Sequence, residues 1–372
     1  MLPFTRPSIG KQEQQAAAEV LASGWLATGP KVQALEQALA DYLGGGISVR
    51  LFNSGTSALE ASLIASGIGS GDQVIVPAMS FAATANVVVR VGAVPVFVEV
   101  DRVTRNLTLE QVESALTPRT RAIMPVHFAG RPVEMGPLRA LAQRQRLLLI
   151  EDAAQAIGSE EGGHRVGAAG NPVCFSFHPN KNMTTIEGGA VASADPRFLS
   201  RIERIRFHGI ERDAAGNLDV PEWGGKMNLP DVNAAIGLVQ LGRLNGFNRR
   251  RQELALRYLE RMPRHAALVL PGDAPGHSWH MFCVCVDFTT LGSSRSEFQV
   301  QLQQRGVGSG IHYPAMHLFS LYRTYGYGPG NFPNAERIGE QTLTLPLFPA
   351  MTDQDVDTVC AAFVDLLPGS DQ

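Results

Sequence analysis

The stretch 147-LLLIEDAAQ-155 places an acid at the end of an apolar strand, and the stretch 173-VCFSFHPNK-181 places a lysine just past the next strand. Asp152 follows the run Leu147–Ile150, and Lys181 follows the run Val173–Phe177. In a parallel sheet ligands bind beyond the carboxyl ends of the strands. We therefore expect Asp152 and Lys181 to face one common site.

Short apolar strands and helices alternate from about residue 70 to 195, which predicts an α/β fold with a mostly parallel sheet between helices. The regular alternation of short strands and helices ends after Pro263. A strand at 281–288, a helix at 296–305, a strand near 343–347 and a helix at 353–367 predict a smaller α+β domain. We expect a large domain, 1–245, with an N-terminal arm, and a small C-terminal domain, 246–372. Two helices, one opening at Asp231 and one over about 246–261, are expected around this boundary.

Composition narrows the function classes. The chain has 372 residues, 44% of them hydrophobic and 18% charged, with a net charge of -3 and a pI of about 6.3. These values predict no nucleic-acid partner, which would need a concentrated basic patch. The densest basic run, Arg249–Arg251, is interpreted as a solvated helix face.

Cysteine use and apolar runs bear on the compartment. The four cysteines form no CxxC pair, and the CxC pair of Cys283 and Cys285 lies in a strand-like run, so no metal site is expected. A reducing, cytoplasmic compartment fits this usage. The N-terminus lacks the apolar stretch of a signal peptide, and no run reaches membrane length, so no membrane insertion is expected.

The acid and the lysine have the spacing that can hold a pyridoxal phosphate (PLP) ring. Lys181 would attack the aldehyde and later act as the base that moves the substrate proton. Asp152 would keep the ring nitrogen protonated, which lets the ring accept electrons. Taken singly, a lysine after a strand is usually a surface residue, and an acid there is often a helix cap.

Other residues are candidates for the rest of the ring and the phosphate. The turn 53-NSGTSAL-59 opens a helix, and its N–H groups with the Thr56 and Ser57 hydroxyls suit a phosphate, although capping alone would explain them. Ser176 is a further phosphate candidate. Gln155 could reach the ring hydroxyl, and Phe81 could stack on the ring, although a single Phe is more often core.

The chain resembles the DegT family of sugar-nucleotide aminotransferases, which belong to the fold type I PLP enzymes. The resemblance covers nearly the whole length, and its most specific motifs are "IEDAAQAIGS" and "FSFHPNKNMTTIEGGAV", with further matches in "LPFTRPSIG", "SGWLATGPKVQALE", "NSGTSALEA", "GDQVIVPAMSFAATAN", "GAVPVFVEVD", "PVHFAG", "NLPDVNAAIGLVQL" and "GIHYPAMH". It implies a seven-stranded, mostly parallel sheet. It also implies PLP as the cofactor.

The resemblance assigns roles by position. Lys181 matches the lysine that binds the cofactor, Asp152 the residue at the ring nitrogen, and Gln155 the residue at the ring hydroxyl. The remaining cofactor contacts that it implies are Thr56, Ser57 and Ser176 at the phosphate and Phe81 against the ring.

The resemblance also implies a homodimer with active sites at the interface. A partner subunit would donate a phosphate contact, for which Asn228 is the first choice and Lys226 the second. This loop departs from the family, which often has aromatic residues where Gly225 and Met227 stand. His312 and Tyr313 match a loop near the sugar nucleotide, and ordinary packing is the other interpretation of both.

The activity implied is transfer of an amine from L-glutamate to a UDP- or dTDP-linked 4-keto sugar by ping-pong kinetics. The sequence looks closest to enzymes that form UDP-4-amino-4-deoxy-L-arabinose for lipid A, with bacillosamine- or perosamine-type aminotransferases and 3-keto-sugar aminotransferases as alternatives. A sugar-nucleotide dehydratase is another class, but that branch resembles enzymes with histidine in place of the lysine. A regulator would need a separate DNA-binding domain. A nicotinamide oxidoreductase would need a G-x-G-x-x-G motif that the chain lacks.

Overall fold

A central β-sheet organises the larger part of the molecule. The structure is a computed structural model that describes residues 1–367 and 369. The strands of this sheet are β1 (Ser48–Phe52), β2 (Gln73–Pro77), β3 (Val94–Val98), β4 (Thr120–Ile123), β5 (Leu148–Leu149), β6 (Glu151–Asp152), β9 (Val173–Ser176) and β10 (Gly189–Ser193). β5 and β6 are one strand around Ile150, whose N–H donates to the carbonyl of Ile123 at 3.1 Å.

Two four-stranded segments, β3-β2-β4-β5 and β1-β10-β9-β6, thereby form one sheet of seven strands among the described residues. β10 is antiparallel to both of its neighbours, and the other pairings are parallel. The predicted α/β class and the mostly parallel sheet are confirmed.

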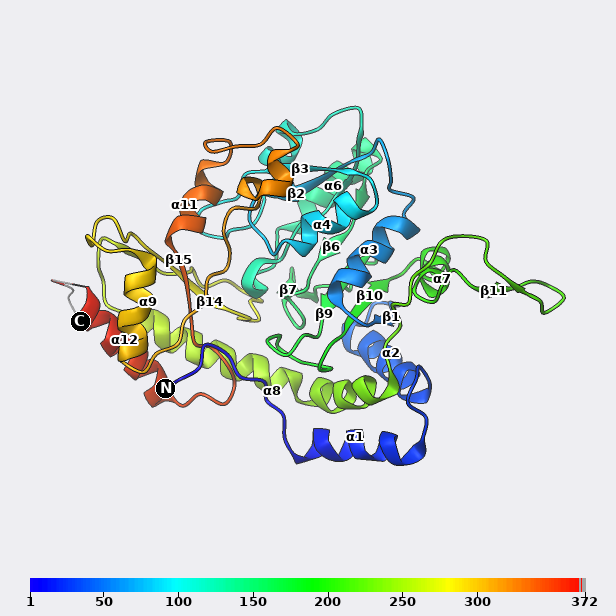
Figure 1. Cartoon of the computed structure of the whole chain (residues 1–372), viewed down its shortest axis with the longest axis horizontal. Helices are drawn as coiled ribbons and strands as arrows, with labels where there is room; N and C mark the ends of the chain where they lie inside the picture. The colour runs from blue at the N-terminus through cyan, green and yellow to red at the C-terminus, as the bar shows by residue number, and fades with distance from the viewer. Residues whose placement is uncertain (368, 370–372) are drawn as a thin grey trace.

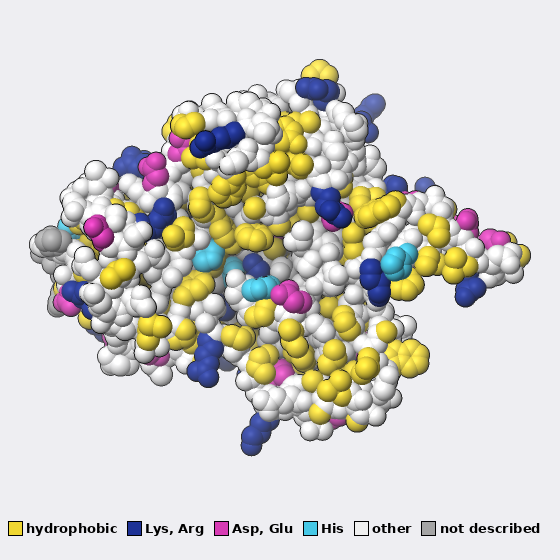
Figure 2. All heavy atoms as spheres, in the orientation of Figure 1, with side chains coloured by type: hydrophobic (Ala, Val, Ile, Leu, Met, Phe, Trp, Pro, Cys, Tyr) yellow, Lys and Arg dark blue, Asp and Glu magenta, His cyan; other side chains and the backbone are white. Residues whose placement is uncertain are grey.

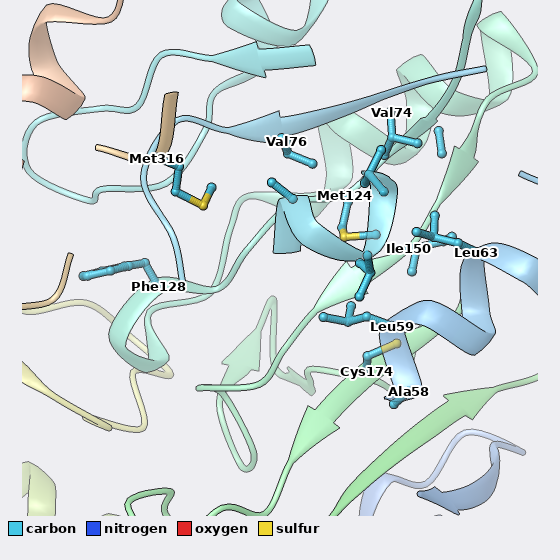
Figure 3. Close-up of a cluster of buried hydrophobic side chains, with 14 of the residues drawn as sticks. Ala58, Leu59, Leu63, Val74, Val76, Met124, Phe128, Ile150, Cys174 and Met316 are labelled. Carbon is cyan, nitrogen blue, oxygen red and sulfur yellow. The ribbon is translucent and has the colours of Figure 1, made fainter. Parts of the chain in front are cut away.

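Helices cover both faces of this sheet because neighbouring side chains on a strand point to opposite faces. Val74 and Val76 of β2 join the core beneath α3, α4 and α7, whereas Ile75 joins the core beneath α5 and α6. Figure 3 shows Val74 and Val76 in one apolar cluster with Leu59 and Leu63 of α3, with Met124 and Ile150 between them. The helices of this part are α1 (Lys11–Ser23), α2 (Pro30–Leu43), α3 (Gly55–Ala65), α4 (Ala83–Arg90), α5 (Leu109–Ser114), α6 (Met135–Gln145) and α7 (Pro196–Ile205), with the 3-10 turn η1 (Phe128–Gly130).

The C-terminal part has its own antiparallel sheet, in the order β13-β14-β15, and its own core. Its elements are β13 (Leu268–Val269), β14 (Phe282–Val286), β15 (Thr342–Leu345), α9 (Arg295–Gln304), η2 (Met316–Leu318), α10 (Ser320–Arg323), α11 (Pro333–Gln341) and α12 (Asp353–Leu366). The predicted strands and helices after Pro263 thus occur within a few residues of their expected positions. Two short hairpins complete the chain, β7–β8 (Glu160–Glu161, His164–Arg165) and β11–β12 (Glu211–Arg212, Leu218–Asp219).

One helix, α8 (Asp231–Arg261), joins the two parts, where the sequence suggested two helices. It runs across the lower half of the molecule in Figure 1, above α1, and contacts α1 and α2 toward one end and α12 toward the other. Leu244 packs in the core of the central sheet, and Leu254 packs in the C-terminal core. The predicted boundary at 245/246 therefore lies inside a continuous helix, and the division into two domains stays a prediction.

The interpretation of Arg249–Arg251 as a solvated face is wrong for one residue. Arg251 is only 3% exposed, and its guanidinium donates to the carbonyls of Trp279, His280 and Leu347. Burial lowers its pKa to about 10. The helical turn of about 100° per residue explains the error, because Arg249 stays exposed while Arg251 faces the C-terminal strands.

Within the described part of the chain, the model has no helix that combines the length and the apolar content needed to cross a bilayer.

Candidate active site

A cavity of about 270 Å³ opens beyond the ends of β6 and β9. In Figure 2 the corresponding face shows histidine and lysine or arginine side chains in a central hollow. The predicted site residues that line the cavity are Thr56, Phe81, Asp152, Gln155, Ser176, Lys181, His312 and Tyr313. The structure thus brings together side chains that are up to 257 positions apart in the sequence.

Lys181 lies in the wall of this cavity, where its backbone N–H donates to the carbonyl of His178 at 2.9 Å. Lys181 is half-buried. Burial lowers the pKa of Lys181 to about 8, and the nearby Asp152 opposes this shift. A larger share of neutral amine is therefore present near pH 7 than for an ordinary lysine, as a nucleophile requires.

Asp152 is 4% exposed and is held at both oxygens. Its Oδ2 accepts from Thr84 Oγ1 at 2.7 Å, and its Oδ1 accepts from the N–H of Ala154 at 3.1 Å. Burial raises the pKa of Asp152, while these hydrogen bonds and the charge of Lys181 act against the rise. A positively charged partner in the cavity would favour the ionised carboxylate.

Thr84 is a site residue that the sequence reasoning missed. It is fully buried near the start of α4, and its hydroxyl also bonds to Ser80 Oγ at 2.8 Å. A Thr in the first turn of a helix is common, so its position alone gave no signal of contact with an acid 68 residues away.

Residues at the N-terminus of α3 also line the cavity. Ser54 caps the helix, since its Oγ accepts from the N–H of Ser57 at 3.1 Å. A Cβ on Gly55 would lie 2.8 Å from Ser176 Cβ, so only glycine lets the helix start this close to β9. Free N–H groups and hydroxyls at such a helix start suit a phosphate.

Ser54, which was not among the predicted phosphate contacts, lines the cavity, whereas the predicted contact Ser57 does not. Ser54, Gly55 and Thr56 line the cavity, whereas Ser57 is outside the lining and bonds to Ser54 Oγ at 2.9 Å. Ser54 belongs to the turn 53-NSGTSAL-59, but the sequence pattern there indicates only a helix-capping role for it. The phosphate roles of Thr56, Ser57 and Ser176 stay predictions.

Gln155 and the His312–Tyr313 segment close another side of the cavity. Gln155 Oε1 accepts from the N–H of Ala129 at 2.7 Å, and its Nε2 donates to Tyr313 Oη at 3.3 Å. The Tyr313 ring lies 5.8 Å from that of Phe81, and His312 stacks on Phe4 of the N-terminal arm at 5.2 Å. The aromatic rings of Phe81 and Tyr313 and the amide of Gln155 could therefore contact a flat ring in the cavity.

Polar residues that the sequence reasoning did not select also line the cavity: His178, Asn180 and Glu187. His178 Nδ1 bonds to Asn180 Oδ1 at 2.8 Å, and His178 Nε2 lies 3.8 Å from Glu187 Oε1. All belong to the segment around Lys181, so their nearness to the lysine was the one available signal. His178 lines the cavity in addition to Lys181 and does not replace it.

This donor set fits PLP. A lysine with a lowered pKa and a buried carboxylate line the same cavity, a glycine-containing helix start offers N–H groups and hydroxyls, and aromatic rings also line the space. Lys181, Asp152 and the start of α3 would hold the aldehyde, ring nitrogen and phosphate respectively.

The sequence profile of the DegT/DnrJ/EryC1/StrS aminotransferase family matches residues 7–364. The chain belongs to this family. The structure is also similar to DesV of S. venezuelae, with 35% identity, a TM-score of 0.90 and coverage of 96% of this chain and 95% of DesV.

Two further solved structures carry names that describe their activity. The putative sugar aminotransferase Spr1654 of Streptococcus pneumoniae, solved in a PMP form, is 29% identical with a TM-score of 0.91 over 99% of this chain and 100% of that one. PseC of Helicobacter pylori, an aminotransferase involved in the biosynthesis of pseudoaminic acid, is 26% identical with a TM-score of 0.91 over 98% of this chain and 99% of that one.

For this DegT-family chain, several expectations are therefore confirmed: the fold type I class, the enzyme class of PLP-dependent sugar aminotransferase, and PLP as the cofactor. The family assignment agrees with the cavity, which contains the amine and the carboxylate that PLP chemistry needs.

The loop expected to reach a partner subunit lies outside the cavity lining of its own chain. Asn228 Nδ2 donates to Thr28 Oγ1 at 2.5 Å, and Lys226 Nζ donates to Asn228 Oδ1 at 2.5 Å. Lys226 is exposed and lies 5.0 Å from the Phe207 ring centre. The amide of Asn228 is thus engaged at both ends, whereas the ammonium of Lys226 has donor capacity to spare.

Proposed function

We propose that this aminotransferase moves an amino group from L-glutamate to a UDP- or dTDP-linked 4-keto sugar in a ping-pong reaction. The observation that carries the proposal is the shared cavity of Lys181 and Asp152 in a chain of a sugar aminotransferase family. Amino sugars of this kind serve lipid A, O-antigen or other cell-surface or secondary-metabolite synthesis in the cytoplasm, and the arabinose-type product for lipid A is the first candidate.

Lys181 carries the proton transfer. Its amine lines the cavity, and burial lowers its pKa to about 8, closer to neutral pH, where a base is most effective. When bound, PLP supplies an electron sink for the carbon that loses the proton. Asp152 would supply negative charge to the ring nitrogen, and Thr84 and the N–H of Ala154 orient its carboxylate.

The lining of the cavity supports a homodimer. No arginine lines it among the described residues, and Lys181 and two half-buried or exposed histidines are its basic side chains. Glutamate and a nucleotide diphosphate are anions that need more positive charge or N–H donors than this. A second subunit that brings Lys226 or Asn228 to the cavity would supply part of it.

Exposed apolar side chains around the same face also support a second copy. Phe81, which lines the cavity, is 57% exposed, and Figure 2 shows apolar side chains spread over the face with the central hollow. A contiguous apolar patch beside the cavity would mark a protein interface.

The test is a panel of UDP- and dTDP-linked keto sugars incubated with and without L-glutamate, with products identified by mass and NMR. An amino sugar formed only with glutamate supports the proposal, and its structure gives the carbon and stereochemistry. A 3-amino sugar would move the enzyme to the 3-keto branch. A deoxy sugar formed without glutamate would overturn the proposal in favour of a dehydratase.

A further inference from the structure

Asn182, the residue next to Lys181, is the centre of a buried chain of hydrogen bonds that the reaction described above does not use. Its Nδ2 donates to Asn248 Oδ1 on α8 and to the carbonyl of Ser278, both at 2.8 Å. Its Oδ1 lies 3.2 Å from His280 Nδ1. Asn182 and His280 are each 4% exposed.

Backbone carbonyls at both ends fix the direction of this chain. The carbonyl of Ser278 can only accept, so the Asn182 amide must turn its Nδ2 toward it. Asn248 Nδ2 donates to the carbonyl of Ile157 at 3.1 Å, which leaves Asn248 Oδ1 to accept from Asn182. Asn182 Oδ1 can then only accept, and the proton between it and His280 must sit on Nδ1.

His280 is consequently the neutral tautomer with its proton on Nδ1. Its Nε2 is buried and has no hydrogen-bond partner among the described residues. Burial lowers the pKa of His280 far below its ordinary value, and the groups that face it, Lys181, Arg251, His312 and His178, act in the same direction. A proton on Nε2 would add a charge to a region that already holds several.

The backbone of His280 ties this chain to the other side of the cavity. Its N–H donates to the carbonyl of Ala129 at 2.9 Å, and the N–H of Ala129 donates to Gln155 Oε1 at 2.7 Å. One residue therefore links the segment after Lys181 with the Gln155 side of the site.

We propose that His280, as the neutral Nδ1–H tautomer, is a positioning residue that orients Lys181 through Asn182. The inference rests on the role proposed for Lys181. A buried donor that fixes the residue beside a reactive amine limits where that amine can lie, and small misplacements of a reacting group are costly in rate.

Two variants separate the hydrogen bond from mere packing. His280→Leu fills the space without a donor, whereas His280→Asn keeps an amide N–H near the position of Nδ1. In the holoenzyme we expect His280→Leu to lower kcat about tenfold or more with a smaller change in KM, and His280→Asn to recover most of the loss, since an unpaired buried acceptor costs about that much. Equal losses in both variants would overturn the proposal.

Readouts that need no sugar substrate keep the test independent of the proposed function. In 15N-histidine NMR of the holoenzyme, His280 should carry its proton on Nδ1 across neutral pH, and the Nε2–H tautomer would overturn the assignment. The absorbance of the cofactor bound to Lys181 should titrate with a midpoint moved by about half a pH unit or more in His280→Leu but not in His280→Asn. A purely structural role would lower the melting temperature and leave this midpoint unchanged.

A cycle with Asn182→Leu checks that both residues act through one contact. The double variant should lose about as much kcat as the worse single variant, because neighbours in one network are not additive. Losses that multiply would overturn the proposal. If His280→Leu does not fold, Asn248→Leu interrupts the same chain farther from the cavity and takes its place, with the absorbance midpoint as the readout.

Discussion

Asp152 is the residue whose charge matters most after Lys181. Asp152→Asn keeps the shape of the side chain but removes the charge that would keep the ring nitrogen protonated, and its Nδ2 has to donate to Thr84 Oγ1 where the carboxylate oxygen accepts. We expect kcat to fall about a hundredfold or more, by analogy with the loss of a charge-stabilising group. Single-turnover kinetics of the half-reaction with glutamate alone, followed as cofactor absorbance changes, measure the corresponding loss in rate constant. Thr84→Val is the matched control and should cost less, about tenfold, since it removes one hydrogen bond to the same carboxylate.

The lowered pKa of Lys181 predicts a pH dependence in the protein without cofactor. The folded-state pKa of about 8 lies below the ordinary value of 10.5, so folding disfavours the protonated amine. Between pH 8 and 10.5 the unfolded chain binds more protons, and the free energy of unfolding therefore rises with pH across this window.

Competitive acylation followed by mass spectrometry measures the midpoint directly. Reactivity of Lys181 should rise with a midpoint near pH 8 in the folded protein and near the ordinary lysine value in denaturant. Coinciding midpoints in the two states would contradict the pKa shift.

At the scale of elements, helix α8 offers a matched pair of glycines. A Cβ on Gly237 would lie 2.6 Å from Leu35 Cδ2 and 2.7 Å from Thr185 Cγ2, whereas a Cβ on Gly242 meets nothing within 4 Å. Gly237→Ala should lower the free energy of unfolding by about 1–3 kcal/mol through overpacking. Gly242→Ala should raise it by about 0.5–1 kcal/mol through helix propensity.

Denaturant unfolding of both variants decides this pair. Gly237 also packs near the loop that follows Lys181, so Gly237→Ala should weaken cofactor binding as well. A stabilised Gly237→Ala variant would mean that α8 packs less closely on α2 than the structure has it.

Element-scale features divide into those the sequence could and could not predict. The strands that end at Asp152 and Ser176 were predictable because short apolar runs stop at polar residues there. The continuity of α8 was not, because Gly242, Asn245 and Gly246 weaken local helix propensity, and packing against α1, α2 and α12 overrides it. The bond from Thr84 to Asp152 and the pairing of Asn182 with His280 join residues far apart in the sequence, and no local pattern marks them.

At the scale of the whole molecule, a subunit-mixing experiment tests the dimer and the donor loop. Lys181→Ala and Lys226→Ala subunits would each be inactive or weak alone. If Lys226 serves the partner's cavity, each mixed dimer has one intact site, and random mixing should restore about a quarter of wild-type activity. The same experiment with Asn228→Ala decides between the two residues.

Analytical ultracentrifugation first establishes that the subunits associate. If they do and neither loop variant recovers activity on mixing, donation across the interface is contradicted. A monomer of about 40 kDa that retains full activity would contradict the dimer itself.

The central claim is that Lys181 and Asp152 hold PLP in one cavity, and its most direct test is to identify the lysine that binds the cofactor covalently. Borohydride reduction of the holoenzyme, followed by digestion and mass spectrometry, fixes the cofactor on the lysine that binds it. The chain has few lysines to choose from, the others being Lys11, Lys31 and Lys226. We expect the label on Lys181 alone, and its loss in Lys181→Ala; a label on another lysine, or none in a wild-type enzyme that retains activity, would contradict the claim.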